Sequence, residues 1–461
     1  MGHFEINATA PALCAGRVKA SDLVDELLER IDAIDGQLGA FVAVDKSGAR
    51  LAARNVDAEI AAGNWRGPLH GIPFAAKDML ATVDLPTEVG MKVLRGRMAG
   101  YDATAVLRLR EAGGILIGKL TQTEGTFGGY HPEARVPKNP WDPSIWPGAS
   151  SSGPGVAVAA RLCSLALASD TGGSIRAPSA ACGVTGLMPS LGRVSGYGAY
   201  PFAPSLDRIG PMATSAIGCA HALRAIAGRD SRDPSTIDEA VPDYAAALGQ
   251  ELAGLRLGFD DRATDDIDPE IGRAMADALF CFERAGIRIV RCRLPETRAA
   301  LEGWVSIAAA GAAAVHREWY CGNKRLFGRE LAELIEFGLG VDEVELSRAI
   351  SLQGELRAAM TAIHGDVDAM LVPVSLKQTP SVASFAQRDP IWEAYPENGR
   401  FTGTYNLTGQ PTITFPAGFT AKGLPIGLQL AGAINDEQTL LHLAHRFQQA
   451  TDWHLRMPEL N

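Results

Sequence analysis

GASSSGPGVAVAARLCSLALASDTGGSIRAPSAACG, residues 148–183, places an apolar segment between two loops that are rich in glycine and serine. Loops of this composition usually belong to linkers, yet the segment between them is suited to a buried core. Its first part, GVAVAARL (155–162), predicts a helix, and its second part, SLALAS (164–169), predicts a strand. A packed element that separates two such loops needs an explanation.

The rest of the chain alternates between helical and strand patterns. Helices are expected at residues 21–36, 49–63, 102–114, 155–162, 270–286 and 436–450. Strands are expected at residues 40–44, 71–80, 115–120, 164–169, 287–294, 369–375, 411–418 and 425–432. In the first helix, Ser21 is expected to cap the start and Gly36 to end it. Strands separated by helices favour an α/β fold, with one mixed or parallel sheet covered by helices on both faces.

The domain organisation follows from the same pattern. The 461 residues contain no internal repeat, no low-complexity tail and no convincing linker. We therefore expect one domain over residues 1–461, in which residues 300–360 form an inserted, mostly helical layer. With 46% hydrophobic residues, the chain can bury a large core.

Composition and charge argue against several classes of protein. The net charge is −10 and the basic residues are scattered, whereas nucleic-acid binding needs a positive face. The first residues lack the basic and apolar regions of a signal peptide, and the longest apolar stretch (305–315) is too short to span a bilayer. Seven cysteines without CxxC spacing indicate reduced thiols. We expect a cytoplasmic protein with no nucleic-acid or membrane partner.

Common catalytic and binding motifs are absent from the sequence. It has no GxSxG nucleophile elbow, no SxxK motif and no GxGxxG dinucleotide loop. His442 and His445 are spaced to share one helix face, but the adjacent acid of a zinc motif is missing, so a core-edge histidine pair is the better interpretation. We therefore expect no metal and no cofactor.

The loop SDTGGSIR (169–176) carries the strongest chemical signal. Its glycines allow successive backbone N–H groups to face one point, which is the geometry of an oxyanion hole. Ser174, at the end of the loop, is placed to attack a carbonyl held there, provided that a base accepts its proton.

Lys77, in the apolar stretch IPFAAKDM, is the candidate base, because none of the nine histidines lies in a comparable loop. Burial would lower its pKa and supply a neutral amine that accepts protons. The alternative is structural: Lys77 snorkels to the surface, or it pairs with Asp78 or another carboxylate.

Residues 147–196 resemble the amidase signature family. The family pattern contains a GGSSGG loop, an apolar helix, a strand, a D-x-GGS-[IV]-R loop and a CG-x-x-GLKPT-x-GR-x-S run, each with a counterpart in PGASSSGPGVAVAARLCSLALASDTGGSIRAPSAACGVTGLMPSLGRVSG. Upstream, GIPFAAKD resembles the family's lysine strand; downstream, SLDRIGPMATS (205–215) and the segment 406–432 resemble later blocks. The resemblance extends from about residue 20 to 455 and is weakest between 230 and 365.

This resemblance implies an α/β/α sandwich with a large mixed sheet and a Ser–cis-Ser–Lys triad. By position, Ser174 corresponds to the nucleophile, Lys77 to the base, and Ser150 to the bridging serine in a cis peptide. The apolar helix and strand between the loops then fix the distance between two serines that must meet. Departures from the pattern at Ala149, Ser152, Pro154 and Met188 remove none of these three groups.

The resemblance implies further site residues. The oxyanion is expected to bind the backbone N–H groups of Thr171, Gly172, Gly173 and Ser174. Thr126 lies near an acyl-pocket position of the family. Asp170, Arg176 and Asp207 are expected to tie the loop through charged hydrogen bonds. One pocket wall is expected from the helical layer, including Trp304, the Ala-rich segment 308–314, Trp319 and Tyr320.

The implied activity is hydrolysis of small amides, aryl amides, esters or carbamates (urethanes) through an acyl-enzyme on Ser174. The alternative is an A-type subunit of a glutamine-dependent amidotransferase, which works only with partner subunits. That type of subunit has an aspartate just before its Y-T-x-x-x-N-L block, where this chain has Gly399 and Arg400. This difference favours a stand-alone hydrolase, as a monomer or homodimer.

Overall fold

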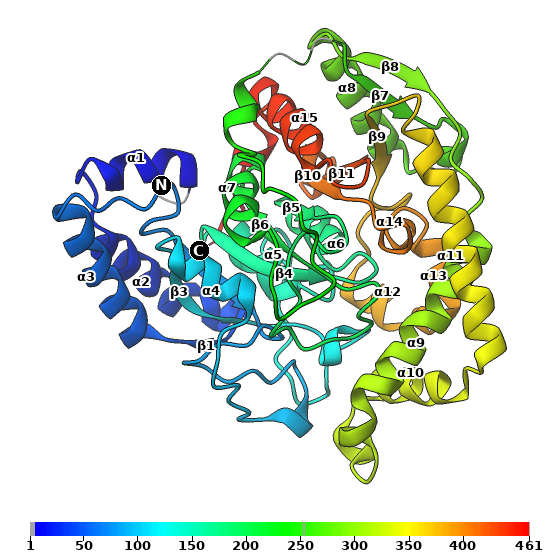
Figure 1. The fold of residues 1–461 in the computed structure, drawn as a ribbon, viewed down its shortest axis with the longest axis horizontal. Coiled ribbons are helices and arrows are strands. Elements are labelled where there is room, and N and C mark those ends of the chain that lie inside the picture. Colours follow the sequence, from blue (N-terminus) through cyan, green and yellow to red (C-terminus); the bar gives the residue numbers. More distant parts are fainter. Residues whose placement is uncertain (1–4, 251, 253, 461) are drawn as a thin grey trace.

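The computed structural model describes residues 5–250, 252 and 254–460, and one sheet of eleven strands forms its centre (Figure 1). The strands are β1 (Phe41–Val44), β2 (Pro73–Lys77), β3 (Ile115–Leu120), β4 (Leu165–Asp170), β5 (Thr185–Met188), β6 (Arg208–Ala213), β7 (Arg256–Phe259), β8 (Arg288–Arg291), β9 (Ala369–Pro373), β10 (Thr412–Phe419) and β11 (Pro425–Gly432). Their order across the sheet is β1-β3-β2-β4-β6-β5-β10-β11-β9-β7-β8. The pairs β2–β3, β2–β4, β7–β8 and β7–β9 are parallel and the other pairs are antiparallel, so the sheet is mixed.

Fifteen α-helices of the described residues surround this sheet. They are α1 (Ile6–Cys14), α2 (Ala20–Leu38), α3 (Lys46–Ala61), α4 (Thr104–Glu111), α5 (Ser152–Ala159), α6 (Arg176–Cys182), α7 (Ala216–Ile226), α8 (Pro269–Arg284), α9 (Arg298–Tyr320), α10 (Arg329–Gly340), α11 (Glu343–Ile363), α12 (Val382–Ala386), α13 (Ile391–Asn398), α14 (Gly403–Thr408) and α15 (Glu437–Ala450). α5 and α6 pack against each other on one face, whereas α4, α7, α15 and α8 form a continuous series on the other. The α/β fold with a mixed sheet covered on both faces is therefore confirmed.

Most helices and strands lie where the sequence predicts them, and β3 and β11 match residue for residue. The expected ends of the first helix are wrong. α2 begins one residue before Ser21, where Asp57 accepts the first two N–H groups, and it continues past Gly36 to a C-cap at Gly39, where φ is 72°. A tertiary contact with α3 thus takes the place of the local cap.

Sequence patterns do not indicate β5, β6 and β7. β6 (RIGPMA) contains glycine and proline, and β5 (TGLM) and β7 (RLGF) are four-residue strands with one glycine each. Both residue types weaken a strand signal. These strands form because neighbours that are distant in the sequence pair with them.

Most residues between 298 and 363 are helical, and α9, α10 and α11 pack on one another at one side of the molecule (Figure 1). Within the described residues, α9 is the one helix that is long and apolar enough to cross a membrane. However, 67% of its apolar window is buried inside the protein, as in a core helix.

β2 and β4 are parallel neighbours, so their carboxyl ends lie at the same edge of the sheet. Lys77 ends β2, and Ser169 and Asp170 end β4. The loop with Ser174 connects β4 to α6, and the loop with Ser150 leads into α5. The fold thus directs all three predicted catalytic residues to one edge of the sheet.

Candidate active site

Lys77 is fully buried at the end of β2. Its Nζ donates to Ser150 Oγ at 2.7 Å and to Ser169 Oγ at 2.8 Å. Asp78, the carboxylate partner considered from the sequence, pairs instead with Lys119 Nζ at 3.5 Å. Lys77 therefore neither snorkels nor pairs with Asp78, and its amine faces two hydroxyl groups.

Burial lowers the pKa of Lys77 from 10.5 to about 7, while the charges of Asp170 and Asp207 act in the opposite direction. Neither carboxylate hydrogen-bonds the amine; its two bonds go to neutral serines. A lysine with a pKa near 7 is largely neutral above that pH, so the amine can accept a proton.

Ser150 is almost fully buried, and the Ala149–Ser150 peptide bond is cis, as the family resemblance implies. Hydrogen bonds to neighbouring segments hold its loop. The Thr123 N–H donates to the Ser150 carbonyl at 3.3 Å, and Ser151 Oγ donates to the Ser169 carbonyl at 3.1 Å. Ser150 is thereby fixed against β4 and against the turn that follows β3.

Ser174 lies in the turn before α6 and is partly exposed. Asp170 holds this turn on both sides, because its carboxylate accepts the Gly173 N–H at 2.7 Å and the Ile175 N–H at 2.9 Å. The position of Ser174 is therefore set by its two neighbours rather than by contacts of its own hydroxyl.

The two serine loops converge at the start of α6. Gly148 packs so closely on α6 that an added Cβ would lie 2.4 Å from Pro178 Cα.

Within the described residues the Ser174 hydroxyl has no hydrogen-bond partner, so Ser150 is hydrogen-bonded to Lys77 but not to Ser174. Catalytic hydrogen bonds are often incomplete without substrate.

Asp170 and Arg176 form a fully buried ion pair, with Nη2 2.8 Å from Oδ1 and Nε 3.0 Å from Oδ2. Asn406 Nδ2 also donates to Asp170 Oδ1 at 3.0 Å. Burial alone would raise the pKa of Asp170, but the charge and hydrogen bonds of Arg176, together with the hydrogen bonds from the Ile175 N–H and Asn406, outweigh it and hold the pKa below its ordinary value. Asp207 accepts from Thr171 Oγ1 at 2.6 Å. These three charged residues tie the loop, as the sequence predicted.

Two stacked aromatic side chains hold the carbonyl groups of the glycine loop. Trp304 Nε1 donates to the Thr171 carbonyl at 3.0 Å, and the Tyr395 hydroxyl donates to the Gly172 carbonyl at 2.7 Å. Their ring centroids lie 3.8 Å apart with 26° between the planes. Trp304 thus lies at the site, as expected for the helical layer.

Two other residues of the expected pocket wall, Trp319 and Tyr320, have different surroundings. Trp319 is exposed, and Tyr320 donates to Glu336 of α10 rather than facing the serine loops. Trp304, in the first part of α9, is the residue of this helix that hydrogen-bonds the glycine loop among the described residues.

The expected oxyanion donors differ in availability. The Gly173 N–H is occupied by Asp170, so it is not free for a substrate oxygen, contrary to expectation. Among the described residues, N–H groups without an acceptor in this loop belong to Thr171, Gly172 and Ser174.

Thr126 ends the short turn η3 (Glu124–Thr126) and has a φ of 66°. Its Oγ1 is buried and has no partner among the described residues. Glu124 Oε2 accepts the Gly328 N–H at 2.8 Å, and burial raises the pKa of Glu124 to about 7. Gly125 packs against His316 of α9. Thr126 therefore lies where this turn meets the helical layer.

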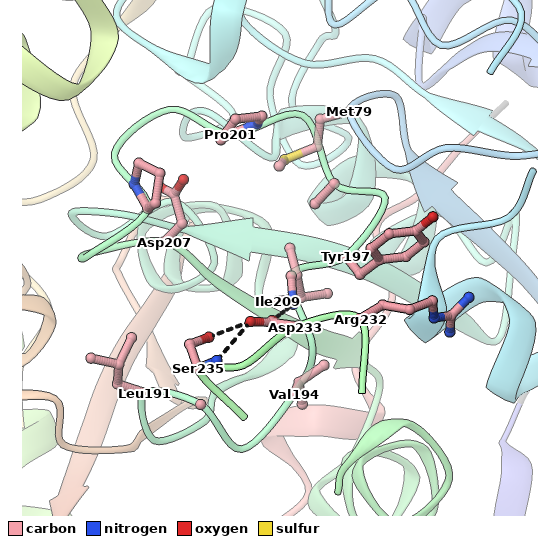
Figure 2. A pocket seen from close by; sticks show the side chains of 14 residues that line it. Met79, Leu191, Val194, Tyr197, Pro201, Asp207, Ile209, Arg232, Asp233 and Ser235 are labelled. Carbon is pink, nitrogen blue, oxygen red and sulfur yellow. Dashed lines mark hydrogen bonds between the residues drawn. The ribbon is translucent and has the colours of Figure 1, made fainter. Parts of the chain in front are cut away.

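A cavity of about 270 Å³ lies next to this site (Figure 2). Figure 2 shows Asp207 at the left of the cavity, Pro201 and Met79 at the top, and Tyr197 and Arg232 at the right. Lys77 and the serines of the two loops do not line it. The cavity adjoins the site through Asp207 and is distinct from the space around the serines.

Sequence reasoning did not identify Ser169 and Tyr395 as site residues. Ser169 has the pattern of a strand residue, although its place beside Asp170 at the end of β4 is a usable signal. Tyr395 lies 223 residues from its partner Gly172, and no local pattern marks it. His442, considered as a zinc ligand, hydrogen-bonds the Gln250 carbonyl at 2.8 Å.

Comparison with known proteins identifies similar sequences along nearly the whole chain. The family model described as Amidase matches residues 22–441. The putative amidase AmiD of Mycobacterium tuberculosis is 37% identical over 455 residues, which cover 99% of this chain and 96% of that protein. The A-type subunit of glutamyl-tRNA(Gln) amidotransferase from Chromohalobacter salexigens is 38% identical over 476 residues, covering 97% of each.

Solved structures show the same similarity. The peptide amidase from Stenotrophomonas maltophilia has a TM-score of 0.83 and 30% identity, covering 99% of this chain and 98% of its own. The 6-aminohexanoate cyclic dimer hydrolase is similar in fold, with a TM-score of 0.90 and 24% identity, covering 99% and 98%.

Proposed function

The chain belongs to the amidase family, and from this membership we propose that it is a serine amidohydrolase of small amides. Family membership and amidase relatives support hydrolysis of a carbon–nitrogen bond. Esters and carbamates are included in the proposal, because attack on the acyl carbon does not depend on the leaving group. The enzyme would act in the cytoplasm as a monomer or homodimer.

The proposed nucleophile is Ser174. Neutral Lys77 accepts the proton of Ser150, and Ser150 accepts the proton of Ser174 as the Ser174 oxygen bonds to the acyl carbon. The proton returns through Ser150 to the leaving amine when the carbon–nitrogen bond breaks. Water, deprotonated by the same route, then attacks the acyl-enzyme, releases the acid and restores Ser174.

The observation that carries this proposal is the contact between Lys77 and Ser150. A fully buried amine whose pKa falls to about 7 lies 2.7 Å from a buried serine hydroxyl. A structural lysine at such a position is expected to face a carboxylate, as Lys119 faces Asp78. An uncharged partner favours proton transfer over ion pairing.

The developing oxyanion would bind the free N–H groups of the glycine loop. Thr171, Gly172 and Ser174 are the proposed donors, because Gly173 is occupied by Asp170. Such donors each contribute roughly 3 kcal/mol of transition-state stabilisation. Thr126 is proposed to contact the acyl part of the substrate, since its turn adjoins both the Ser150 loop and α9.

The amidotransferase alternative is less favoured by the structure around Gly399. An added Cβ at this position would lie 2.6 Å from the Tyr395 ring, so an aspartate there would displace Tyr395. Tyr395 in turn holds the Gly172 carbonyl. The space that the glutamine-binding side chain needs is thus filled in this chain.

The test is hydrolysis by the isolated chain of primary amides, anilides, p-nitrophenyl esters and aryl carbamates. The proposal expects turnover of at least one amide without any partner protein, and loss of that turnover in Ser174→Ala. Activity that appears only with added subunits and glutamine would establish the alternative. Unchanged turnover in Ser174→Ala would overturn the proposal.

A further inference from the structure

Trp304 controls the direction of one peptide unit in the glycine loop. A trans peptide is planar, and its carbonyl and N–H point in opposite directions. The Thr171 carbonyl accepts from Trp304 Nε1 at 3.0 Å. The N–H of the same unit belongs to Gly172, so it points away from Trp304 and has no acceptor among the described residues.

The next peptide unit is held differently. Its carbonyl, that of Gly172, accepts from Tyr395, and its N–H, that of Gly173, donates to Asp170. This unit is therefore anchored at both ends. The unit before it has one anchor, Trp304, at its carbonyl end.

The aromatic pair also packs directly on Gly172. An added Cβ there would lie 2.4 Å from the Tyr395 hydroxyl oxygen and 2.6 Å from Trp304 Cζ2. The two rings are stacked, so each restricts the movement of the other. The pair comes from α9 and α13, which lie next to each other in the fold.

We propose that Trp304 is a positioning residue for oxyanion stabilisation, with Tyr395 as its support. Trp304 fixes the Gly172 N–H in the direction of the acyl oxygen, and the stacked Tyr395 ring keeps the indole in place. This inference rests on the proposed function. It gives the helical insertion a part in the chemical step besides any contact with substrate.

The test compares Trp304→Phe and Tyr395→Phe with the wild type on one amide substrate. Both variants keep an aromatic ring and lose one hydrogen-bond donor. We expect kcat to fall about tenfold in Trp304→Phe, since a donor is misdirected rather than removed. We expect about a threefold fall in Tyr395→Phe, since Asp170 still anchors the second unit. KM is expected to change less than about twofold in both.

Phenylboronic acid supplies a second readout, because it adds to a serine oxygen and forms a tetrahedral anion. Its Ki is expected to rise by the same factor as kcat falls, since both report binding of the oxyanion. Trp319→Phe on the same helix is the matched control, and it is expected to leave kcat and Ki unchanged because Trp319 lies at the exposed end of α9.

Wild-type kcat and Ki in a folded Trp304→Phe, or a raised KM with unchanged kcat, would overturn the inference. If Trp304→Phe does not fold, Tyr395→Phe decides: a raised Ki supports the inference and an unchanged Ki overturns it. Ser174→Ala, assayed in parallel, keeps the two claims apart. If Ser174→Ala is inactive while Trp304→Phe and Tyr395→Phe both have wild-type kcat and Ki, the positioning role is refuted and the proposed function stands.

Discussion

Replacement of Lys77 by methionine tests the buried amine directly. The pKa of Lys77 falls from 10.5 to about 7 on burial. At about 1.4 kcal/mol per pH unit, this shift destabilises the fold by about 4 kcal/mol at pH 7 relative to an unperturbed lysine. Methionine removes that cost and also the hydrogen bonds to Ser150 and Ser169, which contribute about 1 kcal/mol each. Lys77→Met is thus expected to be about 2 kcal/mol more stable than the wild type at pH 7.

The pH dependence has a definite sign. Between about pH 7 and 10.5 the unfolded chain binds a proton at Lys77 that the folded chain has lost, so wild-type stability rises with pH in this range. Between pH 7 and pH 9, the free energy of unfolding of the wild type should rise by about 2 kcal/mol relative to that of Lys77→Met. Below about pH 6, the difference in unfolding free energy between the two proteins should be nearly constant.

The assay is urea unfolding of both proteins at pH 6, 7, 8 and 9, followed by tryptophan fluorescence, with turnover measured alongside. Lys77→Met should lose at least about a thousandfold in kcat. Lys119→Met is the control, because it removes a buried lysine that is paired with a carboxylate, Asp78. Since Asp78 then stays buried without its ion-pair partner, the free energy of unfolding should fall by about 3 kcal/mol. A stability difference between Lys77→Met and wild type that does not change from pH 7 to 9 would refute the low pKa and, with it, the neutral base.

Three further predictions concern neighbouring residues. Ser174→Ala should fold normally and show no acyl adduct by intact-mass measurement after mixing with an activated ester, whereas an adduct in this variant would place the nucleophile elsewhere. Ser150→Ala should lower kcat about a thousandfold, and Ser169→Ala, which removes the other partner of the same amine, by less than about tenfold; equal losses would contradict a relay through Ser150. Burial raises the pKa of Glu124 to about 7, so the folded state binds the extra proton and stability falls as pH rises from about 4.5 to 7. Urea unfolding should show the wild type losing about 2 kcal/mol relative to Glu124→Gln between pH 5 and pH 8, and a difference that is flat with pH would count against a buried carboxyl.

The strand β3 and the lysine strand β2 illustrate what local sequence predicts well. Both are apolar runs bounded by turn residues, and both lie fully inside the sheet. The same reasoning failed for β6, whose glycine and proline hide a strand that is held by pairing with β4 and β5. It also failed at Ser21, where Asp57 of another helix supplies the cap.

For the site, the glycine loop around Ser174 could be read from its own residues, and Lys77 was a candidate base beside a structural alternative. The role of Ser150 came only from the family resemblance. The sequence did not identify Ser169 as a second partner of the lysine, nor the bond between Asp170 and the Gly173 N–H. The first depends on how two parallel strands align, and the second on how a turn closes. Neither is encoded by residue type alone.

The amino-acid sequence by itself determined the α/β fold, the family and the candidate catalytic groups, because hydrophobic periodicity and motif spacing act over a few residues. The tertiary structure alone decided the state of those groups. Lys77 has a pKa near 7 because the sheet removes it from water, and the glycine loop is oriented by Trp304 and Tyr395, which lie 133 and 223 residues away from the carbonyls they hold. Burial and long-range hydrogen bonds exist only once the chain is folded, so no local pattern contains them.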